Sequence, residues 1–302
     1  MRVAFVTIWY PVAMGRYLCD ALRRRSDVDV WTAGPYTGRW LPWSGGMSLP
    51  MSYVYPPNMS LPLGVRPEVN YSLLEGRAPW QPDLWIEANA ALFTQGRPKG
   101  RYAVVGTDPH VLDYSAARAK ADFFFCMQKP YMKPGDHWLP YAYDPTWHTP
   151  SAIPWTEREY DAALLGLQYP QRTQLVDRLR SRGHSVRYEL GLAYGDAAKV
   201  YHNTRVGLNW SSMQDTTARA FELMAFGLPA VLNRVPDLMA MFTDGEHFVG
   251  FDNLDQAVAA VEMLLKDPER AKKMGEAARH AVEANTWDAR VEQILKTVGL
   301  LN

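Results

Sequence analysis

Short apolar runs alternate with amphipathic stretches through the first half of the chain. The runs predict strands at Arg2–Ile8, Val28–Trp31, Leu84–Glu87, Tyr102–Gly106 and Asp122–Cys126. Helices are predicted at Gly15–Arg25, with Tyr17, Leu18, Ala21 and Leu22 on its apolar face, and at Ala116–Lys120. A run such as Asp122–Cys126, apolar without alternation, is typical of a strand buried on both faces of a parallel sheet. The pattern predicts a doubly wound α/β domain.

The same alternation starts again after the Pro-rich segment near Pro150–Glu157. Further strands are predicted at Ala162–Leu165, Val186–Glu189, Val206–Asn209 and Ala230–Leu232. Helices are predicted at Arg172–Arg182, Gly195–Asn203, from Thr216 or Thr217 onward, around Pro236–Phe242, and over 254–266 behind an Asn253/Gln256 capping box. Pro268 then opens a helix, and Thr286 caps a last one. The chain is therefore expected to contain two α/β domains.

Composition narrows the class of protein. Lys and Arg together number 32, and so do Asp and Glu, so no net field favours nucleic acid or an acidic membrane. Only two cysteines occur, Cys19 and Cys126, and their apolar surroundings favour buried free thiols over disulfides or structural zinc. The N-terminal apolar run suits a first strand and not a signal peptide, and no run reaches the roughly 20 residues of a membrane span. A cytoplasmic enzyme is expected.

The segment from Thr216 to Gly250 carries the most chemistry. A helix that begins near Thr216 and Thr217 presents unpaired amides and a positive dipole end to an anion. Arg219, in its first turn, adds a cation that can bind phosphate, and Glu222 lies on the same face as an acceptor for ribose hydroxyls. A diphosphate beside a diol is a nucleotide-sugar. The same spacing also suits a surface ion pair, and Gly227-Leu228-Pro229 also suits an ordinary helix stop.

The order of these residues resembles a known family. The pattern R-x-x-E-x-x-A-x-G-x-P, a strand, and then L-x-x-x-F-x-D-G-E is similar to the nucleotide-binding half of GT-B glycosyltransferases. Within them it most resembles the spore-maturation-protein-like group, related to the retaining family 4. The similarity continues through residues 251–290. Upstream it includes WLPYAYDPTWHTP, which resembles the segment between the two domains, and the strand and loop around Gly166 and Arg172.

The resemblance implies a GT-B fold, with two Rossmann-like doubly wound domains facing a central cleft. Residues 1–150 would be the acceptor-side domain and 151–286 the nucleotide-sugar domain, with the terminal helix at 287–302 returning to the first. The implied activity is sugar transfer from a nucleotide diphosphate, most simply a UDP-sugar, with retention. No other cofactor and no metal are expected, since a basic pocket can neutralise a diphosphate leaving group. The acceptor stays open between a glycan, a protein, a small molecule and a modified nucleic-acid base, and so does the oligomeric state.

Candidate donor residues follow from the motif positions. Arg219 and Arg172 are the candidates for the diphosphate, although Arg172 also suits an exposed helix start. Glu222 is assigned to the ribose diol. The remaining donor-side candidates are Thr216, Thr217, Asn209 and Gly166. Family 4 has the pattern Glu-x7-Glu, in which the first Glu faces the donor sugar. Counting back from Glu222, this chain has Gln214 at that position, with Asp215 adjacent.

Candidate acceptor-side residues lie in the first half. Asp108 and His110, in VVGTDPH, resemble the D-x-H stretch of the spore-maturation group. Either side chain can act as general base in an inverting reaction or position the sugar in a retaining one. Equally, Asp108 can cap the turn at Pro109 with His110 packed beneath it. The strand order brings Trp9, Tyr10 and Gly15 to the same sheet edge, and Trp and Tyr between Trp31 and Trp85 can stack on sugars or simply pack that insertion.

Other nucleotide enzymes are excluded by their missing motifs. No G-x-G-x-x-G follows Ile8, Val105 or Leu165, which argues against a dehydrogenase, and no Walker A loop occurs. A second class of function stays open. The departure at Gln214 and the Trp-rich insertion also suit a non-catalytic nucleotide-sugar or glycan-binding protein that keeps the GT-B fold.

Overall fold

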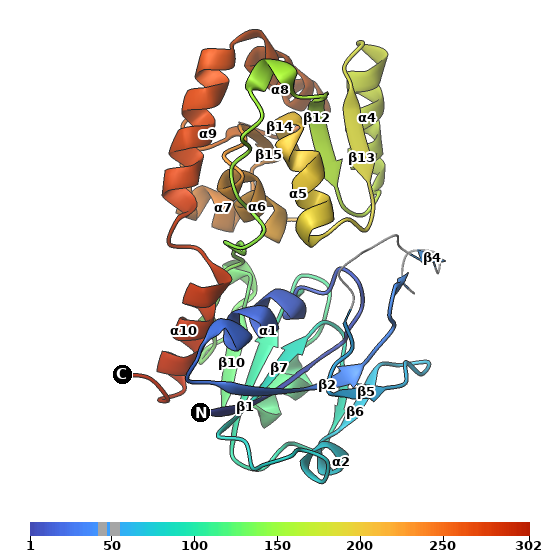
Figure 1. Ribbon diagram of the computed structural model, residues 1–302, viewed down its shortest axis with the longest axis vertical. Helices are drawn as coiled ribbons and strands as arrows, with labels where there is room; N and C mark the ends of the chain where they lie inside the picture. The colour runs from blue at the N-terminus through green and yellow to red at the C-terminus, as the bar shows by residue number, and fades with distance from the viewer. Residues whose placement is uncertain (42–46, 49–54) are drawn as a thin grey trace. The chain divides into compact units, whose positions relative to one another are not determined.

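The computed structural model describes residues 1–41, 47–48 and 55–302 (Figure 1). They divide into two compact units. The first comprises 1–41, 47–48, 55–140 and 287–302, and the second comprises 141–286. Sequence expectations that fall on 42–46 and 49–54, including the aromatic Trp43 and Tyr53, lie outside the described residues.

The first unit is built on a seven-stranded parallel sheet in the order β11-β10-β9-β7-β1-β2-β5. Its strands are β1 (Arg2–Thr7), β2 (Asp29–Pro35), β5 (Met59–Leu61), β7 (Leu84–Asn89), β9 (Arg101–Gly106), β10 (Phe123–Cys126) and β11 (His137–Trp138). Two small sheets pair β3 (Trp40–Leu41) with β4 (Met47–Ser48), and β6 (Glu68–Asn70) with β8 (Phe93–Gln95). The helices are α1 (Gly15–Arg24), α2 (Tyr71–Glu75), α3 (Ser115–Lys120) and α10 (Trp287–Thr297).

The C-terminal helix α10 belongs to this first unit because it packs along α1. The rings of Tyr17 and Trp287 stack at 6.4 Å, and Arg24 forms a bidentate ion pair with Asp288. The apolar face predicted for α1 is buried, Leu18 and Leu22 included. The amphipathic pattern of α1 therefore decides which face receives the last helix.

The second unit contains a five-stranded parallel sheet in the order β13-β12-β14-β15-β16. Its strands are β12 (Tyr160–Leu165), β13 (Val186–Glu189), β14 (Thr204–Asn209), β15 (Ala230–Asn233) and β16 (Val249–Phe251). Its helices are α4 (Pro170–Ser181), α5 (Tyr194–His202), α6 (Ala218–Ala225), α7 (Pro236–Met241), α8 (Leu254–Lys266) and α9 (Pro268–Val282). Leu164, Leu208 and Val231 are completely buried in its core, as their unbroken apolar runs require.

Both sheets reverse their strand order at one point. In the first unit the reversal lies between β1 and β7, and in the second it lies between β12 and β14. Helices that follow strands on either side of such a point diverge, which leaves room for a ligand at the carboxyl ends of the strands. Thr7 and Asn89 end the two strands in the first unit, and Leu165 and Asn209 end them in the second.

The helix signals in the sequence are largely present, with one shift. Asn253 accepts a hydrogen bond from Gln256 N at 3.0 Å, as the capping box predicts. Gln256 Oε1 accepts its hydrogen bond from Asp252 N (2.9 Å) and not from the N–H of the cap residue. The predicted strand Val28–Trp31 was too short. It runs to Pro35 because β5 pairs with its second half, a partner remote in sequence.

Several Trp residues of the aromatic-rich region are core residues. Trp31 and Trp85 are buried and meet edge to face at 6.3 Å, so these two pack the domain. Trp40 is 46% exposed. Both cysteines are buried free thiols, as predicted. Within the described ranges, no helix combines the length and the apolar character needed to cross a membrane.

Candidate active site

Arg172 lies at the point where the strand order of the second sheet reverses, and it bonds to the segments that meet there. It lies in the first turn of α4, and its guanidinium donates to Trp210 O (2.6 Å), Leu167 O (3.0 Å) and Asn209 Oδ1 (3.1 Å). The side chain stacks over the Tyr169 ring at 4.9 Å and is buried. The alternative of an exposed helix-start residue is therefore wrong.

The backbone at Gly166 makes this arrangement possible. Gly166 follows β12 with φ +149°, and a Cβ there would lie 3.1 Å from Arg172 Nη1. A side chain would be strained and would press on the guanidinium. Gly166 thus shapes the loop that receives Arg172.

Helix α6 presents the motif residues as the sequence predicted, with one difference at the cap. Thr217 is the N-cap residue, so the helix begins where the sequence predicts, but the Thr217 hydroxyl makes no capping hydrogen bond. Its Oγ1 is buried and has no hydrogen-bond partner among the described residues. Thr216 and Thr217 line a pocket of about 10 Å³ together with Asn209, Ser211 and Asn233. Such a volume matches a single water molecule or one ligand oxygen.

Arg219 and Glu222 form an ion pair across one turn of α6. Arg219 also lies over the Tyr201 ring at 5.7 Å. Glu222 is 5% exposed, and its Oε2 accepts the hydrogen bond from Arg219 Nη1. The sequence also suited an ordinary surface ion pair. Because Glu222 is buried, this pair is partly dehydrated and interacts more strongly than a surface pair.

Two cations converge near the N-terminus of α6. Burial lowers the pKa of Arg172, Tyr169 opposes that shift, and the charge of Arg219 lowers the pKa further. Arg172 donates to neutral carbonyl and amide oxygens, and no ion pair joins it to an acid in the described structure. Arg219 pairs with Glu222, and the charge of Asp215 also acts on Arg172. Two guanidiniums this close repel one another, and a bound anion would relieve that repulsion.

His148 is a neighbour of Glu222 that the motifs did not reveal. It is 1% exposed, and its Nδ1 accepts the Asp144 N–H at 2.9 Å, which places the ring proton on Nε2. Nε2 lies 4.0 Å from Glu222 Oε1. Burial lowers the pKa of His148, and the charge of Glu222 opposes that shift. One oxygen of Glu222 therefore faces Arg219 and the other faces a neutral imidazole.

The two positions predicted to face the donor sugar differ in exposure. Gln214 is exposed, whereas Asp215 is buried and accepts a hydrogen bond from Met213 N at 2.9 Å. Asp215 therefore shapes the loop that leads into α6. Both assignments to the donor sugar stay predictions.

In the first unit, Asp108 and His110 follow β9 at the carboxyl edge of the sheet. Asp108 accepts a hydrogen bond from the Thr107 hydroxyl, and its backbone N–H donates to Tyr114 Oη at 3.3 Å. The His110 ring lies 6.3 Å from that of Tyr131. Burial raises the pKa of Tyr10, and the charge of Asp108 adds to that shift, so these two candidates share one environment.

Two other acceptor-side candidates, Trp9 and Gly15, have structural roles. The Trp9 ring is completely buried, and its Nε1 donates to Ala33 O at 3.0 Å. A Cβ on Gly15 would lie 2.6 Å from Thr7 Oγ1, so Gly15 lets α1 approach β1 closely. Contact of the Trp9 ring with an acceptor would require it to leave the core, which makes Tyr10 the better candidate of this group.

Two buried charged groups in this unit were not predicted from the sequence. Arg16 is completely buried, donates only Nε to Tyr10 O (3.1 Å), and lies over the Trp9 and Tyr55 rings. Glu87 is also completely buried and accepts from Tyr71 Oη (2.5 Å), Tyr102 Oη and Asn89 Nδ2 (2.6 Å). Burial raises the pKa of Glu87 against the lowering effect of these bonds. The apolar periodicity of the sequence does not reveal either group. A strand or helix tolerates one buried polar residue when that residue finds hydrogen-bond partners on other elements.

Among the described residues no three His, Cys, Asp or Glu side chains come together as a cation site.

Comparison with known proteins shows what this part of the chain resembles. Residues 152–296 match a family model described as "Glycosyl transferase-like". This part of the chain is therefore similar to glycosyltransferases. The matched range contains α4, α6 and the residues that converge between them. The spore-maturation-protein-like group is not distinguished by this match and stays a prediction.

Solved structures of GT-B glycosyltransferases match over the whole chain. Sucrose-phosphate synthase from Thermosynechococcus elongatus is 15% identical, with 98% of each chain covered and a TM-score of 0.61. HepE from Anabaena in complex with UDP and glucose is 11% identical, with 100% of each chain covered and a TM-score of 0.65. An alpha-glucosyltransferase in complex with UDP and a 13-mer DNA is 11% identical, with 99% of each chain covered and a TM-score of 0.65. No curated protein matches the chain. These likenesses confirm the α/β fold with parallel sheets, and the family-model match over residues 152–296 supports transferase activity.

Proposed function

We propose that this protein transfers a sugar from a UDP-sugar to an acceptor hydroxyl, with retention and without a metal. The observation that carries the proposal is the pair of guanidiniums, Arg172 and Arg219, near the N-terminus of α6, close enough that the charge of Arg219 lowers the pKa of Arg172. Two guanidiniums at a helix N-terminus suit a diphosphate. HepE and the alpha-glucosyltransferase of similar fold hold UDP, which supports uridine as the base.

In this proposal the Arg219–Glu222 pair opens when the donor binds. Arg219 turns from the carboxylate to the diphosphate, and Glu222 then accepts hydrogen bonds from the ribose hydroxyls. Arg172 uses N–H groups that are not committed to Leu167, Asn209 and Trp210, since a guanidinium has five. The Thr217 hydroxyl, buried without a partner, donates to a phosphate oxygen. The ion pair keeps both side chains oriented before the ligand arrives, which reduces the ordering cost of binding.

The transfer step needs the bond from the anomeric carbon to the UDP oxygen to break while one to the acceptor oxygen forms. The two arginines stabilise the charge that develops on the leaving diphosphate, the largest electrostatic demand of the reaction. With retention, the leaving phosphate takes the acceptor proton. Asp108 and His110 then position the acceptor and are not required as bases.

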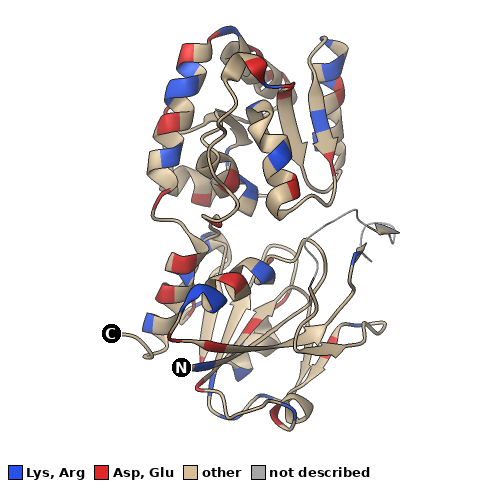
Figure 2. Ribbon diagram, in the orientation of Figure 1, with Lys and Arg blue, Asp and Glu red and all other residues tan. Residues whose placement is uncertain are grey.

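The charge distribution favours a neutral acceptor over a polyanion. Lys and Arg equal Asp and Glu in number, and Figure 2 shows basic and acidic residues interspersed on helices of both units. A protein that holds a nucleic-acid backbone normally concentrates basic residues on one face. The DNA in one structural neighbour is therefore not carried over to this chain.

The test is to measure the binding affinities of uridine, UMP and UDP by titration calorimetry. Affinity should rise in that order. Glu222→Gln should weaken all three by about 1.5–3 kcal/mol, the range for a hydrogen bond to a charged group. Arg219→Ala should weaken UMP and UDP but not uridine. Arg178→Ala, on the exposed side of α4, is the matched control and should change none. Equal losses for uridine and UDP in Arg219→Ala would contradict the diphosphate assignment.

Turnover distinguishes a transferase from the alternative, a non-catalytic binding protein. A transferase should release UDP slowly from the matching UDP-sugar even without an acceptor. Product anomeric configuration, read by NMR, then decides retention, and activity that survives chelation decides metal independence. Donor binding with no UDP release across a panel of UDP-sugars would favour the binding protein.

A further inference from the structure

The first unit contains a pocket that the donor site does not account for. It has a volume of about 470 Å³ and lies between β8 and α3. Ala116 and Ala117 form the α3 side, and Phe93 and Gln95 form the β8 side. A volume of this size falls in the range of small-molecule sites.

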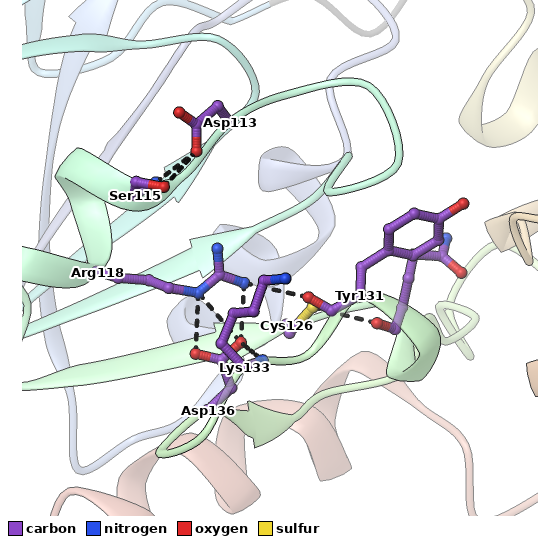
Figure 3. Close-up of polar contacts among 8 residues, drawn as sticks. Asp113, Ser115, Arg118, Cys126, Tyr131, Lys133 and Asp136 are labelled. Atoms are coloured by element: carbon purple, nitrogen blue, oxygen red, sulfur yellow. Dashed lines mark hydrogen bonds and ion pairs between the residues drawn. The ribbon is translucent and has the colours of Figure 1, made fainter.

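The α3 wall of the pocket is held in place at both ends. Asp113 accepts hydrogen bonds from Ser115 N (2.9 Å) and Ser115 Oγ (2.6 Å) at the start of the helix, as Figure 3 shows. Arg118 does not line the pocket and is instead paired with Asp136 at 2.8 Å (Figure 3). Lys120 Nζ donates to Thr94 O at 2.8 Å, which joins the end of α3 to β8. The pocket is therefore formed before any ligand arrives.

The inner end of the pocket is shared with the Asp108 segment. Tyr114 lines the pocket, and its hydroxyl donates to Asn89 O at 2.6 Å and accepts from Asp108 N at 3.3 Å. Ala91, also in the lining, has φ +69°, a conformation that costs energy for a residue with a Cβ. Such strain persists where the surrounding structure imposes it, and it is frequent at ligand sites.

The lining chemistry suits a neutral sugar. Phe93 is 47% exposed; the Arg66 guanidinium lies over one face of its ring at 5.0 Å, and the other face is offered to the apolar face of a pyranose. Gln95, Glu68 and Asp113 supply amide and carboxylate groups for hydroxyls, which both donate and accept. Lys120 in the lining and Arg66 over Phe93 balance these two acids among the described residues. The pocket therefore carries no excess positive charge to attract a phosphate or carboxylate, and a purely apolar ligand would leave the polar groups unpaired.

We propose that this pocket binds a neutral carbohydrate unit of the acceptor. The proposal rests on the proposed function and names the class of acceptor that the function leaves open. Through Tyr114, a sugar seated here lies against the segment that carries Asp108 and His110. The pocket then acts as an acceptor subsite within the first unit.

Two alanines of α3 give a matched pair of variants. Ala116 and Ala119 are both exposed on the same short helix, but only Ala116 lines the pocket. Ala116→Trp should fill the pocket, whereas Ala119→Trp adds the same side chain outside it. Equal thermal unfolding of the two variants establishes that both fold.

Binding is measured without nucleotide, by saturation-transfer NMR with maltose, cellobiose, lactose and chitobiose. At least one disaccharide should bind wild type and Ala119→Trp, and Ala116→Trp should bind it about tenfold more weakly, a change of 1.4 kcal/mol. The phosphorylated counterpart of that sugar should bind wild type more weakly than the neutral one. No binding to wild type by any of the four sugars, or equal binding to both variants, would overturn the proposal.

UDP titration separates this outcome from the donor site. UDP should bind wild type and both Trp variants with equal affinity, because Glu222 and Arg219 lie in the other unit. If UDP binds but no disaccharide does, the pocket proposal alone fails. If disaccharides bind in the pocket but no UDP-sugar is bound or used, the proposed function fails and the pocket remains a carbohydrate site.

Discussion

Arg16 and Arg172 occupy equivalent places in the two units and have opposite surroundings. Each lies in the first turn of the helix that follows the strand where its sheet reverses, and each is buried. Arg172 donates three hydrogen bonds, to Trp210 O, Leu167 O and Asn209 Oδ1. Arg16 donates one, and its Nη1 and Nη2 are buried with no hydrogen-bond partner among the described residues.

The comparison of Arg16 with Arg172 shows that burial alone does not reveal what a charged side chain does in the structure. The three acceptors of Arg172 come from two loops and a strand end, so its guanidinium connects segments that carry the candidate donor site. Arg16 relies on the rings of Trp9 and Tyr55, at 5.8 and 5.1 Å. Cation–π contacts offset part of the dehydration of a buried charge but leave N–H groups unsatisfied. Removing the two side chains should therefore change stability in opposite directions.

The largest effect is expected for Arg172→Met. It leaves buried Asn209 Oδ1 and the part-buried Leu167 O and Trp210 O without their donor, and should lower the free energy of unfolding of the second unit by about 2–4 kcal/mol. Hydrogen exchange resolved by peptide, under increasing urea, assigns the loss to this unit. Arg178→Met, in the same helix with its side chain 49% exposed, should stay within about 0.5 kcal/mol of wild type. A tie between the two variants would mean that Arg172 is not a connecting residue.

Arg16→Met should have the opposite sign. Replacing this buried guanidinium, whose Nη1 and Nη2 have no partner among the described residues, by an apolar side chain of similar length should leave the first unit unchanged or stabilise it by about 1 kcal/mol. The same exchange experiment, read on peptides of β1 and α1, measures it. A destabilisation as large as that of Arg172→Met would show that the Arg16 nitrogens are satisfied in solution, and the contrast would disappear.

Acidification should separate the units further through His148 and Glu87. Burial lowers the pKa of His148 below its ordinary 6.5, so its stabilising contribution is complete above that pH and is lost as pH falls towards the folded-state pKa. Burial raises the pKa of Glu87, so its contribution is complete below its ordinary 4.5 and is lost as pH rises through the folded-state pKa. Lowering the pH from neutral should weaken the second unit through His148 and strengthen the first through Glu87.

The variant His148→Asn isolates the first of these groups. Its Oδ1 can accept the Asp144 N–H that His148 Nδ1 accepts, and it does not titrate. Relative to wild type, the variant should gain stability as pH falls below 6.5. Unfolding measured at a series of pH values checks this, and parallel pH profiles for wild type and variant would refute it.

The smallest effect is expected for Thr217→Val. Its hydroxyl is buried without a partner among the described residues, so the isosteric change should alter stability by no more than about 0.5 kcal/mol. UDP affinity should fall by about 0.5–1.5 kcal/mol if the hydroxyl meets a phosphate oxygen. Thr173→Val, exposed on α4, is the control for both measurements. Unchanged UDP affinity would remove Thr217 from the donor site and leave Arg172 and Arg219 as its phosphate ligands.

The strand and helix pattern was readable from the sequence because it depends on local periodicity. Unbroken apolar runs such as Ala162–Leu165 predicted strands buried on both faces, and these are the strands of the two parallel sheets. The spacing of Arg219 and Glu222 placed them one turn apart on a helix, where they pair. The short strands β5, β6, β8 and β16 were missed, since three residues carry too little periodic signal.

The sequence by itself determined which residues lie in strands and helices and which strand ends carry candidate chemistry, because periodicity reports burial along one dimension. Only the tertiary structure decided which buried groups are satisfied. Arg172 meets Asn209 from 37 positions away, Glu222 finds His148 from another part of the unit, and Glu87 is held by two tyrosines of other elements. Hydrogen-bond partners and pockets depend on where remote segments meet, and no local pattern contains that information.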